Sequence, residues 1–192
     1  MGRWPEPSTV HGDVCLVPLT RELADLDTVA YLSSPRAISS HSAGRWPVDE
    51  FTLEKNLPLI AHHEAEHRAG EAFAYALLGP RADREWGCVY LRPLAPYLER
   101  THTRLALPEA TVCSAAVATF WLVDDASQRP TAAEVVRVVE GWTEAWRPAP
   151  VVFRCLPEER ESRAALEGSS MERVDASDQP LPYLWFLRKQ EV

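Results

Sequence analysis

The alternation of apolar and polar positions predicts a chain in which strands and helices are mixed. Apolar runs of strand length lie at 14–17, 72–78, 86–91, 111–123, 151–156, 171–174 and 181–188. Apolar residues spaced three or four apart predict helices at 21–32, 49–68, 131–146 and 157–167. Pro58 is expected to kink or split the second helix, and Gly70 to end it. Two segments rich in proline or small polar residues are expected to be loops, 33–47 and 93–108.

The stretch from Ala115 to Trp146 carries the clearest local pattern. It consists of an uncharged apolar strand, a short polar turn and an amphipathic helix. Thr131 and Glu134 have the S/T-x-x-E spacing of a capping box, which predicts that the helix begins there. A strand that leads into a helix N-terminus is a common place for a bound phosphate. The sequence therefore indicates a ligand-binding junction at this turn.

Composition and charge narrow the class of protein. The chain has 192 residues, 46% of them hydrophobic, and a formal net charge of −8 at pH 7. We expect one globular domain at 13–192 behind an N-terminal arm at 1–12. The acidic charge argues against nucleic acid or an anionic membrane as a partner. The oligomeric state stays open, with a homodimer among the alternatives.

The beginning of the chain and its cysteines bear on location. The first residues have no apolar core of the signal-peptide kind, and no apolar run is long enough to span a bilayer. The four cysteines are scattered, without a C-x-x-C pair, as in proteins of a reducing compartment. We therefore expect a cytoplasmic protein.

Three local stretches, taken with the order of elements, resemble the GNAT N-acetyltransferase superfamily. EAFAYALLGPRADREWGCVYLRPL is similar to the family's middle hairpin. VATFWLVDD and the helix from Thr131 are similar to its cofactor-side strand, loop and helix, and VVFRCLPEERESRAALEGSSMERV to its next strand and helix. The resemblance extends from about Val14 to Arg188. It implies an α/β (α+β) fold, with a central mixed twisted sheet of about six to seven strands flanked by about four helices.

The resemblance also implies an activity and a cofactor, namely transfer of an acyl group from acetyl-CoA to an amine of a small molecule or peptide. The backbone at Trp121, Leu122 and Val123 is then expected to pair with the pantetheine arm of acetyl-CoA. The other positions with which the family holds its cofactor fall on Gln128, Arg129, Thr131, Ala132, Ala133 and Ser162.

Several of these positions depart from the family pattern. Thr131 replaces the central glycine of the pyrophosphate loop, and Pro130 beside it has no backbone N–H to donate. Further along, Glu159 stands where the family usually has asparagine, and Leu166 stands where it often has tyrosine. The pyrophosphate loop is therefore degenerate, and an inactive GNAT-like binding or interaction module is the alternative to an enzyme.

Candidate catalytic residues follow from the mechanism that the resemblance implies. A base removes a proton from the amine, the amine attacks the thioester carbonyl, and a backbone N–H stabilises the oxyanion. Glu85, which precedes the GCVYL strand, is the candidate base, and Tyr90 within that strand is the candidate acid or orienting group. The acceptor is expected against 33–47, whose candidate ligands for a carboxylate or phosphate are Arg36, His41 and Arg45.

A competing motif lies in the second predicted helix. His63, Glu64 and His67 form H-E-x-x-H, in which two histidines one turn apart bind zinc and the glutamate acts as base. Phe73 occupies the place of a third ligand, and the stretch is polar on all sides. A zinc-dependent hydrolase is therefore the second alternative, while the main hypothesis includes no metal.

Overall fold

A computed structural model describes residues 9–11, 14–46, 49–127, 129–146 and 150–188. The strands are β1 (Thr9–His11), β2 (Val14–Pro18), β3 (Phe73–Leu78), β4 (Glu85–Pro93), β5 (Arg104–Leu105), β6 (Ala116–Leu122), β7 (Val151–Cys155), β8 (Met171–Val174), β9 (Ala176–Ser177) and β10 (Leu184–Arg188). The helices are the 3-10 turn η1 (Arg21–Leu23) and α1 (Ala24–Leu32), α2 (Pro35–Ser42), α3 (Leu53–Ala69), α4 (Leu94–Thr101), α5 (Glu109–Ser114), α6 (Ala132–Trp146) and α7 (Arg160–Glu167).

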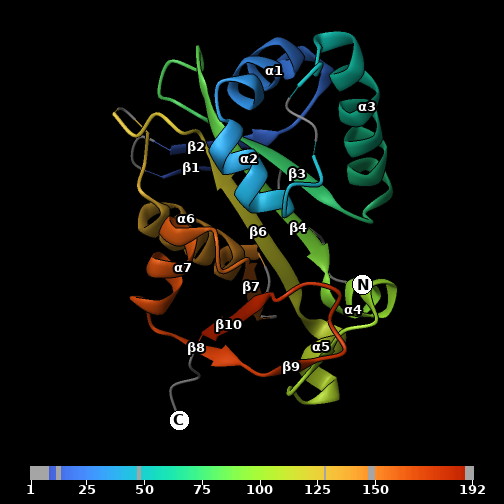
Figure 1. The fold of residues 1–192 in the computed structure, drawn as a ribbon. Helices are drawn as coiled ribbons and strands as arrows, with labels where there is room; N and C mark the ends of the chain where they lie inside the picture. The colour runs from blue at the N-terminus through green and yellow to red at the C-terminus, as the bar shows by residue number, and fades with distance from the viewer. Residues whose placement is uncertain (1–8, 12–13, 47–48, 128, 147–149, 189–192) are drawn as a thin grey trace.

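The main sheet has eight strands in the spatial order β1-β2-β3-β4-β6-β7-β10-β8 (Figure 1). Neighbours pair antiparallel except β6 and β7, which run parallel from Ala116–Val151 to Ala118–Phe153. Beyond Ala118, β6 continues to Leu122 paired with β4 alone. The two parallel strands therefore part in the middle of the sheet. From Thr119 onward, one edge of β6 has no neighbouring strand among the described residues.

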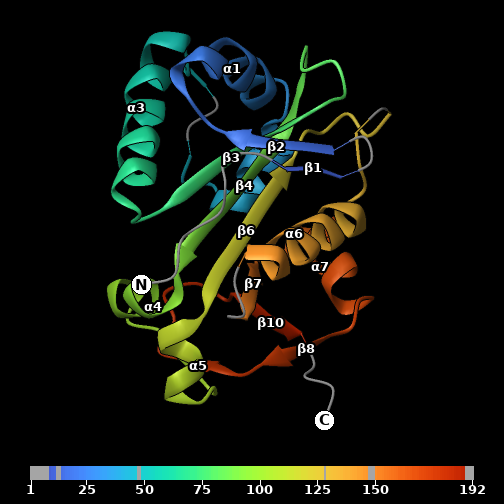
Figure 2. The ribbon, with the colours of Figure 1, turned by 180° about the vertical axis from the view of Figure 1, so that it is seen from behind.

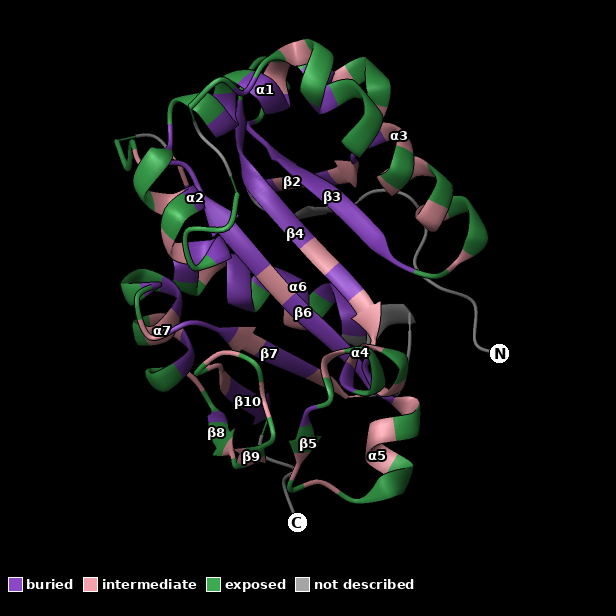
Figure 3. Cartoon of the chain, turned by 45° about the vertical axis from the view of Figure 1, so that its right-hand side comes forward, coloured by how far each residue is buried: buried purple, intermediate pink, exposed green. Residues whose placement is uncertain are grey.

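Helices cover both faces of this sheet. Helices α1, α2 and α3 lie on the face toward the viewer in Figure 1, and α6 lies on the opposite face in Figure 2. On β4, Val89 and Leu91 pack in the core beneath α6, whereas Cys88 and Tyr90 face the core beneath α1 and α3. The central strands are therefore buried on both sides, as Figure 3 shows, which explains their nearly continuous apolar runs.

The predicted fold class is confirmed, with a mixed sheet of eight strands and seven α-helices in the described part of the chain. The predicted capping box is present, because Thr131 N donates to the Glu134 carboxylate over 2.7 Å and Glu134 N donates to Thr131 Oγ1 over 3.3 Å. Within the expected N-terminal arm, Thr9–His11 pairs with β2, and the rest lies outside the described residues. No helix in the described part of the chain is long and apolar enough to cross a membrane.

Three helices form where none was predicted. Residues 33–47 were expected to be a loop, but Pro35 occupies the first turn of α2. The Asp124 carboxylate accepts the backbone N–H groups of Arg36 and Ala37 over 3.1 and 3.0 Å, and so caps this helix from a distant segment. Similarly, α4 lies within the predicted loop at 93–108, and α5 occupies the start of the strand predicted at 111–123.

Two predicted helices differ in their ends. The helix expected at 49–68 is continuous, so Pro58 does not split it, and it begins after Thr52, whose side chain caps Lys55 N. Gly70 ends it in the left-handed conformation, as predicted. The helix expected from Pro157 begins only at Arg160.

Candidate active site

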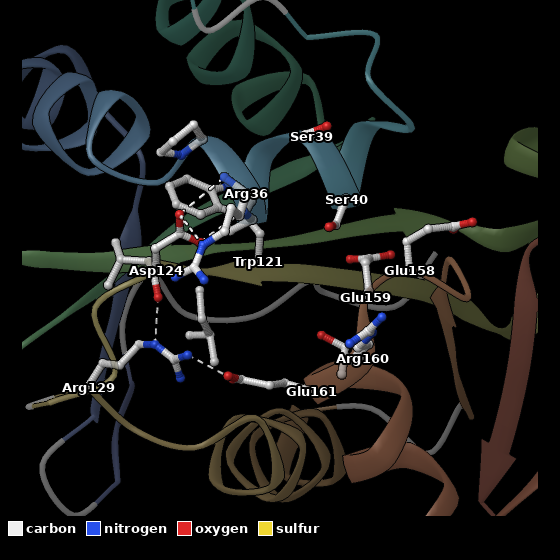
Figure 4. Close-up of a pocket in the computed structure, with 15 residues that line it drawn as sticks. Arg36, Ser39, Ser40, Trp121, Asp124, Arg129, Glu158, Glu159, Arg160 and Glu161 are labelled. Atoms are coloured by element: carbon white, nitrogen blue, oxygen red, sulfur yellow. Dashed lines mark hydrogen bonds and ion pairs between the residues drawn. The ribbon is translucent and has the colours of Figure 1, made fainter.

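A cleft of about 730 Å³ opens where β6 and β7 part (Figure 4). The end of β6 forms one wall, α2 covers it, and the start of α7 lies opposite. Five of the residues predicted to hold the cofactor line this cleft, namely Trp121, Leu122, Val123, Arg129 and Ser162. An extended ligand that carries amide groups fits this wall, because a strand edge presents backbone donors and acceptors.

Charge in the cleft does not favour a phosphate. Its lining contains three arginines against four carboxylates, a net formal charge of −1. Arg129, with a side chain that is 6% exposed, donates from Nε to the Val123 carbonyl over 2.6 Å and from Nη2 to Glu161 over 2.8 Å. Arg36 pairs with Asp124 over 3.4 Å. Arg160 is exposed and has no ion-pair partner among the described residues, so one arginine is left free for an anion.

The N-terminus of α6 is also occupied by the chain itself. Glu134 accepts hydrogen bonds from Thr131 N and Thr131 Oγ1 over 2.7 and 2.8 Å, and the backbone bond lowers the pKa of this carboxyl. Thr131, Ala132 and Ala133 do not line the cleft, and Gln128 lies outside the described residues. The residues present fit the amide-bearing arm of acetyl-CoA, but this arrangement does not fit its pyrophosphate.

A second, smaller cavity of about 180 Å³ lies on the face of the sheet beneath α2 and α3. Aromatic rings crowd it: the His41 centroid lies 5.4 Å from Trp46 and 6.1 Å from Tyr90, and His63 lies 5.8 Å from Tyr90. Tyr90 is thus the predicted catalytic residue that the structure places in a cavity. Burial raises the pKa of Tyr90 well above its usual range, and Trp121 Nε1 donates to its hydroxyl over 3.3 Å.

A buried histidine–glutamate pair separates the two cavities. His41 Nδ1 lies 2.7 Å from Glu159 Oε1, and the two side chains are only 4% and 6% exposed. The other Glu159 oxygen accepts the backbone N–H of Leu156 over 2.6 Å. His41 lines the small cavity, whereas Glu159 lines the cleft. Sequence reasoning noted both residues but did not pair them, because they are 118 positions apart.

Glu85, the predicted base, lies in neither cavity lining. It is 2% exposed, and Cys88 Sγ donates to its Oε1 over 3.2 Å. Asp27 lies beside both, so that ligand atoms of these three residues fall within 4.8 Å of one another. Burial, and next the charge of Asp27, raise the pKa of Glu85 well above its usual range. These surroundings favour the protonated form of the Glu85 carboxyl.

The H-E-x-x-H residues lie on α3, but their side chains make separate contacts. His63 lines the small cavity and lies 3.5 Å from Glu66, while His67 packs edge-on against Phe73 and Tyr75. The Glu64 carboxylate accepts the backbone N–H of Arg21 over 2.8 Å. Within the described ranges, neither histidine belongs to a group of three side chains with the spacing of a metal site.

Comparison with solved structures identifies the fold. No protein-family model and no curated protein sequence matches the chain. The ribosomal-protein-S5-alanine acetyltransferase from Vibrio fischeri is similar in structure, with a TM-score of 0.67 and 10% identity over 95% of this chain and 96% of that one. RimL, the ribosomal L7/L12 alpha-N-protein acetyltransferase in complex with coenzyme A, is also similar. Its TM-score is 0.68, with 11% sequence identity over 95% of this chain and 96% of that one.

A third structure combines the same fold with two ligands. The microcin C7 self-immunity acetyltransferase MccE, in complex with acetyl-CoA and AMP, has a TM-score of 0.65 and 10% identity over 94% of each chain. The chain therefore has the fold of the GNAT acetyltransferases, as its sequence predicted. At these identities the comparison establishes the fold, and the chemistry must be argued from the residues of this chain.

Proposed function

We propose that the protein is an N-acyltransferase that transfers an acyl group from acetyl-CoA to an amine of a small molecule or peptide. The observation that carries this proposal is the His41–Glu159 pair, which stands between a cleft along the free edge of β6 and a small cavity. A thioester that enters along β6 and an amine in the cavity meet at this wall.

The donor side rests on the backbone of β6. Trp121, Leu122 and Val123 line the cleft where β7 no longer pairs with β6, so they are placed to hold an arm that contains amide groups. When bound, an acyl-CoA supplies the thioester, and the amine nitrogen bonds to its carbonyl carbon as the C–S bond breaks and a thiol is released. Ser162 and Arg129 frame the outer part of the same cleft.

The amine must lose a proton to become a nucleophile, and His41 is placed to accept it. Glu159 holds Nδ1, which favours the tautomer with a lone pair on Nε2, and Nε2 has no partner among the described residues. The carboxylate then stabilises the imidazolium that forms. Glu85 is less suited to this role, because it is 2% exposed and lines neither the cleft nor the small cavity.

Tyr90 is the proposed acid. Burial raises the pKa of its hydroxyl, so the proton is retained at neutral pH and is available to the thiolate that leaves. The hydrogen bond from Trp121 Nε1 fixes the hydroxyl at the point where β6 separates the cleft from the cavity. In this proposal the donor, the base and the acid act at the wall between the cleft and the small cavity.

The second candidate is a binding module without catalysis. Two carboxylates favour it. Glu134 accepts a hydrogen bond at the N-terminus of α6, and Glu161 pairs with Arg129, so both groups that could bind a pyrophosphate are already engaged. We retain the further expectations of one domain at 13–192, a cytoplasmic location and no nucleic-acid partner as parts of the proposal. A zinc hydrolase receives no support from the positions of His63 and His67.

One experiment tests the proposal and separates its two forms. Thiol release from acetyl-CoA is followed with a panel of amines, and thermal unfolding is recorded with and without millimolar acetyl-CoA. We expect acetyl-CoA to raise the Tm and thiol release to require an amine. Replacing His41 by Gln should slow release by about 10²–10⁴-fold, the usual contribution of a general base, while the Tm shift persists.

The matched control is His62→Gln on α3, because that histidine is 68% exposed and lines neither cavity. It should release thiol at the wild-type rate. A Tm that does not respond to acetyl-CoA, with no amine-dependent release, refutes the enzyme and leaves the binding module. Equal rates in the two histidine variants refute the role of His41.

A further inference from the structure

The small cavity is lined by two arginines, of which one is paired with a carboxylate and the other, within the described ranges, is not. Arg92 is neutralised, because its two terminal nitrogens donate to the two oxygens of Glu66 over 2.9 and 3.2 Å. Arg154 has no carboxylate within ion-pair distance in the described part of the chain. Its buried Nε has no hydrogen-bond partner there either. One guanidinium in this cavity therefore lacks a counter-ion.

Arg154 is held in place by neutral groups. It projects from β7, with Cζ 4.0 Å from the centroid of the Tyr183 ring, and Nη1 donates to the Tyr97 hydroxyl over 3.0 Å. Stacking on a ring and one hydrogen bond fix the plane of the guanidinium but leave its charge uncompensated. Arg154 is half-buried, and its Nε is buried without a partner among the described residues. Removing part of a charge from water without a counter-ion costs free energy, so this arrangement indicates an anionic group that arrives from outside the chain.

We infer that this cavity binds the acceptor as a small primary amine that carries a carboxylate, with Arg154 pairing the carboxylate. The inference rests on the proposed function and specifies its substrate class as amino acids and close analogues. His41 and Arg154 line the same cavity, so one molecule can place its amine at the first and its carboxylate at the second. The cavity volume of about 180 Å³ is below the range of about 300–1,000 Å³ that is usual for larger ligands.

Binding is measured first without any acyl donor, by isothermal titration with common L-amino acids and with the amide of each. The amide keeps the amine and side chain but removes the negative charge. We expect at least one amino acid to bind, and its amide to bind about 10–100-fold more weakly, which is the range for a charge-assisted hydrogen bond. Arg154→Met should remove this preference, and Arg154→Lys should restore part of it.

Arg100→Met is the matched control. The Arg100 guanidinium also lies against the Tyr97 ring, at 5.6 Å, but this residue does not line the cavity. It should leave the preference for the carboxylate unchanged. Equal affinity for amino acid and amide, or equal loss in the Arg154 and Arg100 variants, overturns the inference.

Acyl transfer to the same panel distinguishes a failure of the inference from a failure of the proposed function. If amines without a carboxylate, or peptides with an amidated C-terminus, are acylated as well as amino acids, the enzyme stands and the inference falls. If amino acids bind through Arg154 but no thiol is released from acetyl-CoA, the cavity assignment stands and the proposed transfer falls.

Discussion

Two buried glutamates of this protein have opposite surroundings. Glu159 meets a histidine and a backbone N–H, and it lies at a wall between two cavities. Glu85 meets Asp27 and the thiol of Cys88, and one of its oxygens has no partner among the described residues. Hydrogen-bond partners offset the charge of the Glu159 carboxylate, whereas burial and Asp27 raise the pKa of Glu85 and favour its protonated form. Burial alone therefore does not identify a catalytic carboxylate, and the partner determines what the group can do.

Substitution of Glu159 is expected to have the largest effect on the free energy of unfolding. Replacing it by Ala removes the partner of His41 and leaves Leu156 N without an acceptor, so the free energy of unfolding should fall by about 3 kcal/mol. Glu159→Gln keeps an acceptor for Leu156 N and should cost less. Urea unfolding of the variants measures both values. Glu158→Ala, a change to the exposed neighbour, should have little effect, and an equal loss there would contradict a special role for Glu159.

The sequence predicted the sheet better than it predicted the helices. Strands at 72–78 and 86–91 were clear, because buried apolar runs bounded by polar turns are local signals. Helix α2 was missed because its cap is the Asp124 side chain, which reaches it only in the folded chain. The sequence predicts a strand where α5 forms, because a short apolar run has no distinct period, although Pro108 and Glu109 are typical of a helix start.

The next prediction is that Glu85 makes the free energy of unfolding depend on pH. The pKa of Glu85 is higher in the folded protein than its value of about 4.5 in the unfolded chain. The contribution of Glu85 to the free energy of unfolding is therefore largest below about pH 4.5, and it falls as the pH rises toward the pKa of the folded state. Glu85→Gln cannot titrate, and it keeps the size of the side chain. The stability of this variant relative to wild type should therefore increase with pH above about 4.5, by at most about 1.4 kcal/mol per pH unit.

Chemical unfolding at several pH values measures this difference. Glu99→Gln, which changes an exposed carboxylate on α4, serves as control and should give a curve parallel to wild type. Parallel curves for Glu85→Gln and wild type would mean that Glu85 ionises as readily in the folded protein as in the unfolded one. That outcome would restore Glu85 as a candidate base.

The sequence predicts the residues of the proposed donor side together, whereas on the proposed acceptor side it predicts His41 and Tyr90 without their partners. Trp121, Leu122 and Val123 follow one another along a strand, so a family pattern finds them together. The pair of His41 with Glu159 depends on two helices that meet only in the fold. Arg154 has a local signal, because it is the one charged residue inside the apolar run VVFRCL.

The smallest expected effect is a change in the affinity for coenzyme A when an exposed carboxylate, Glu161, is replaced. Glu161 is 62% exposed and pairs with Arg129 over 2.8 Å at the mouth of the cleft. Glu161→Gln removes this competitor and brings the formal charge of the cleft lining from −1 to zero. Coenzyme A should then bind about threefold more tightly, because an exposed ion pair contributes roughly 0.2–1 kcal/mol.

Calorimetric titration at low and high salt provides the measurement, and the gain should shrink as salt screens the charges. Glu167→Gln at the other end of α7 is the control, because Glu167 pairs with Arg163 over 3.8 Å and does not line the cleft. A gain of equal size in both variants would reflect net charge rather than release of Arg129. Weaker binding in Glu161→Gln would mean that this pair positions Arg129 for the donor instead of withholding it.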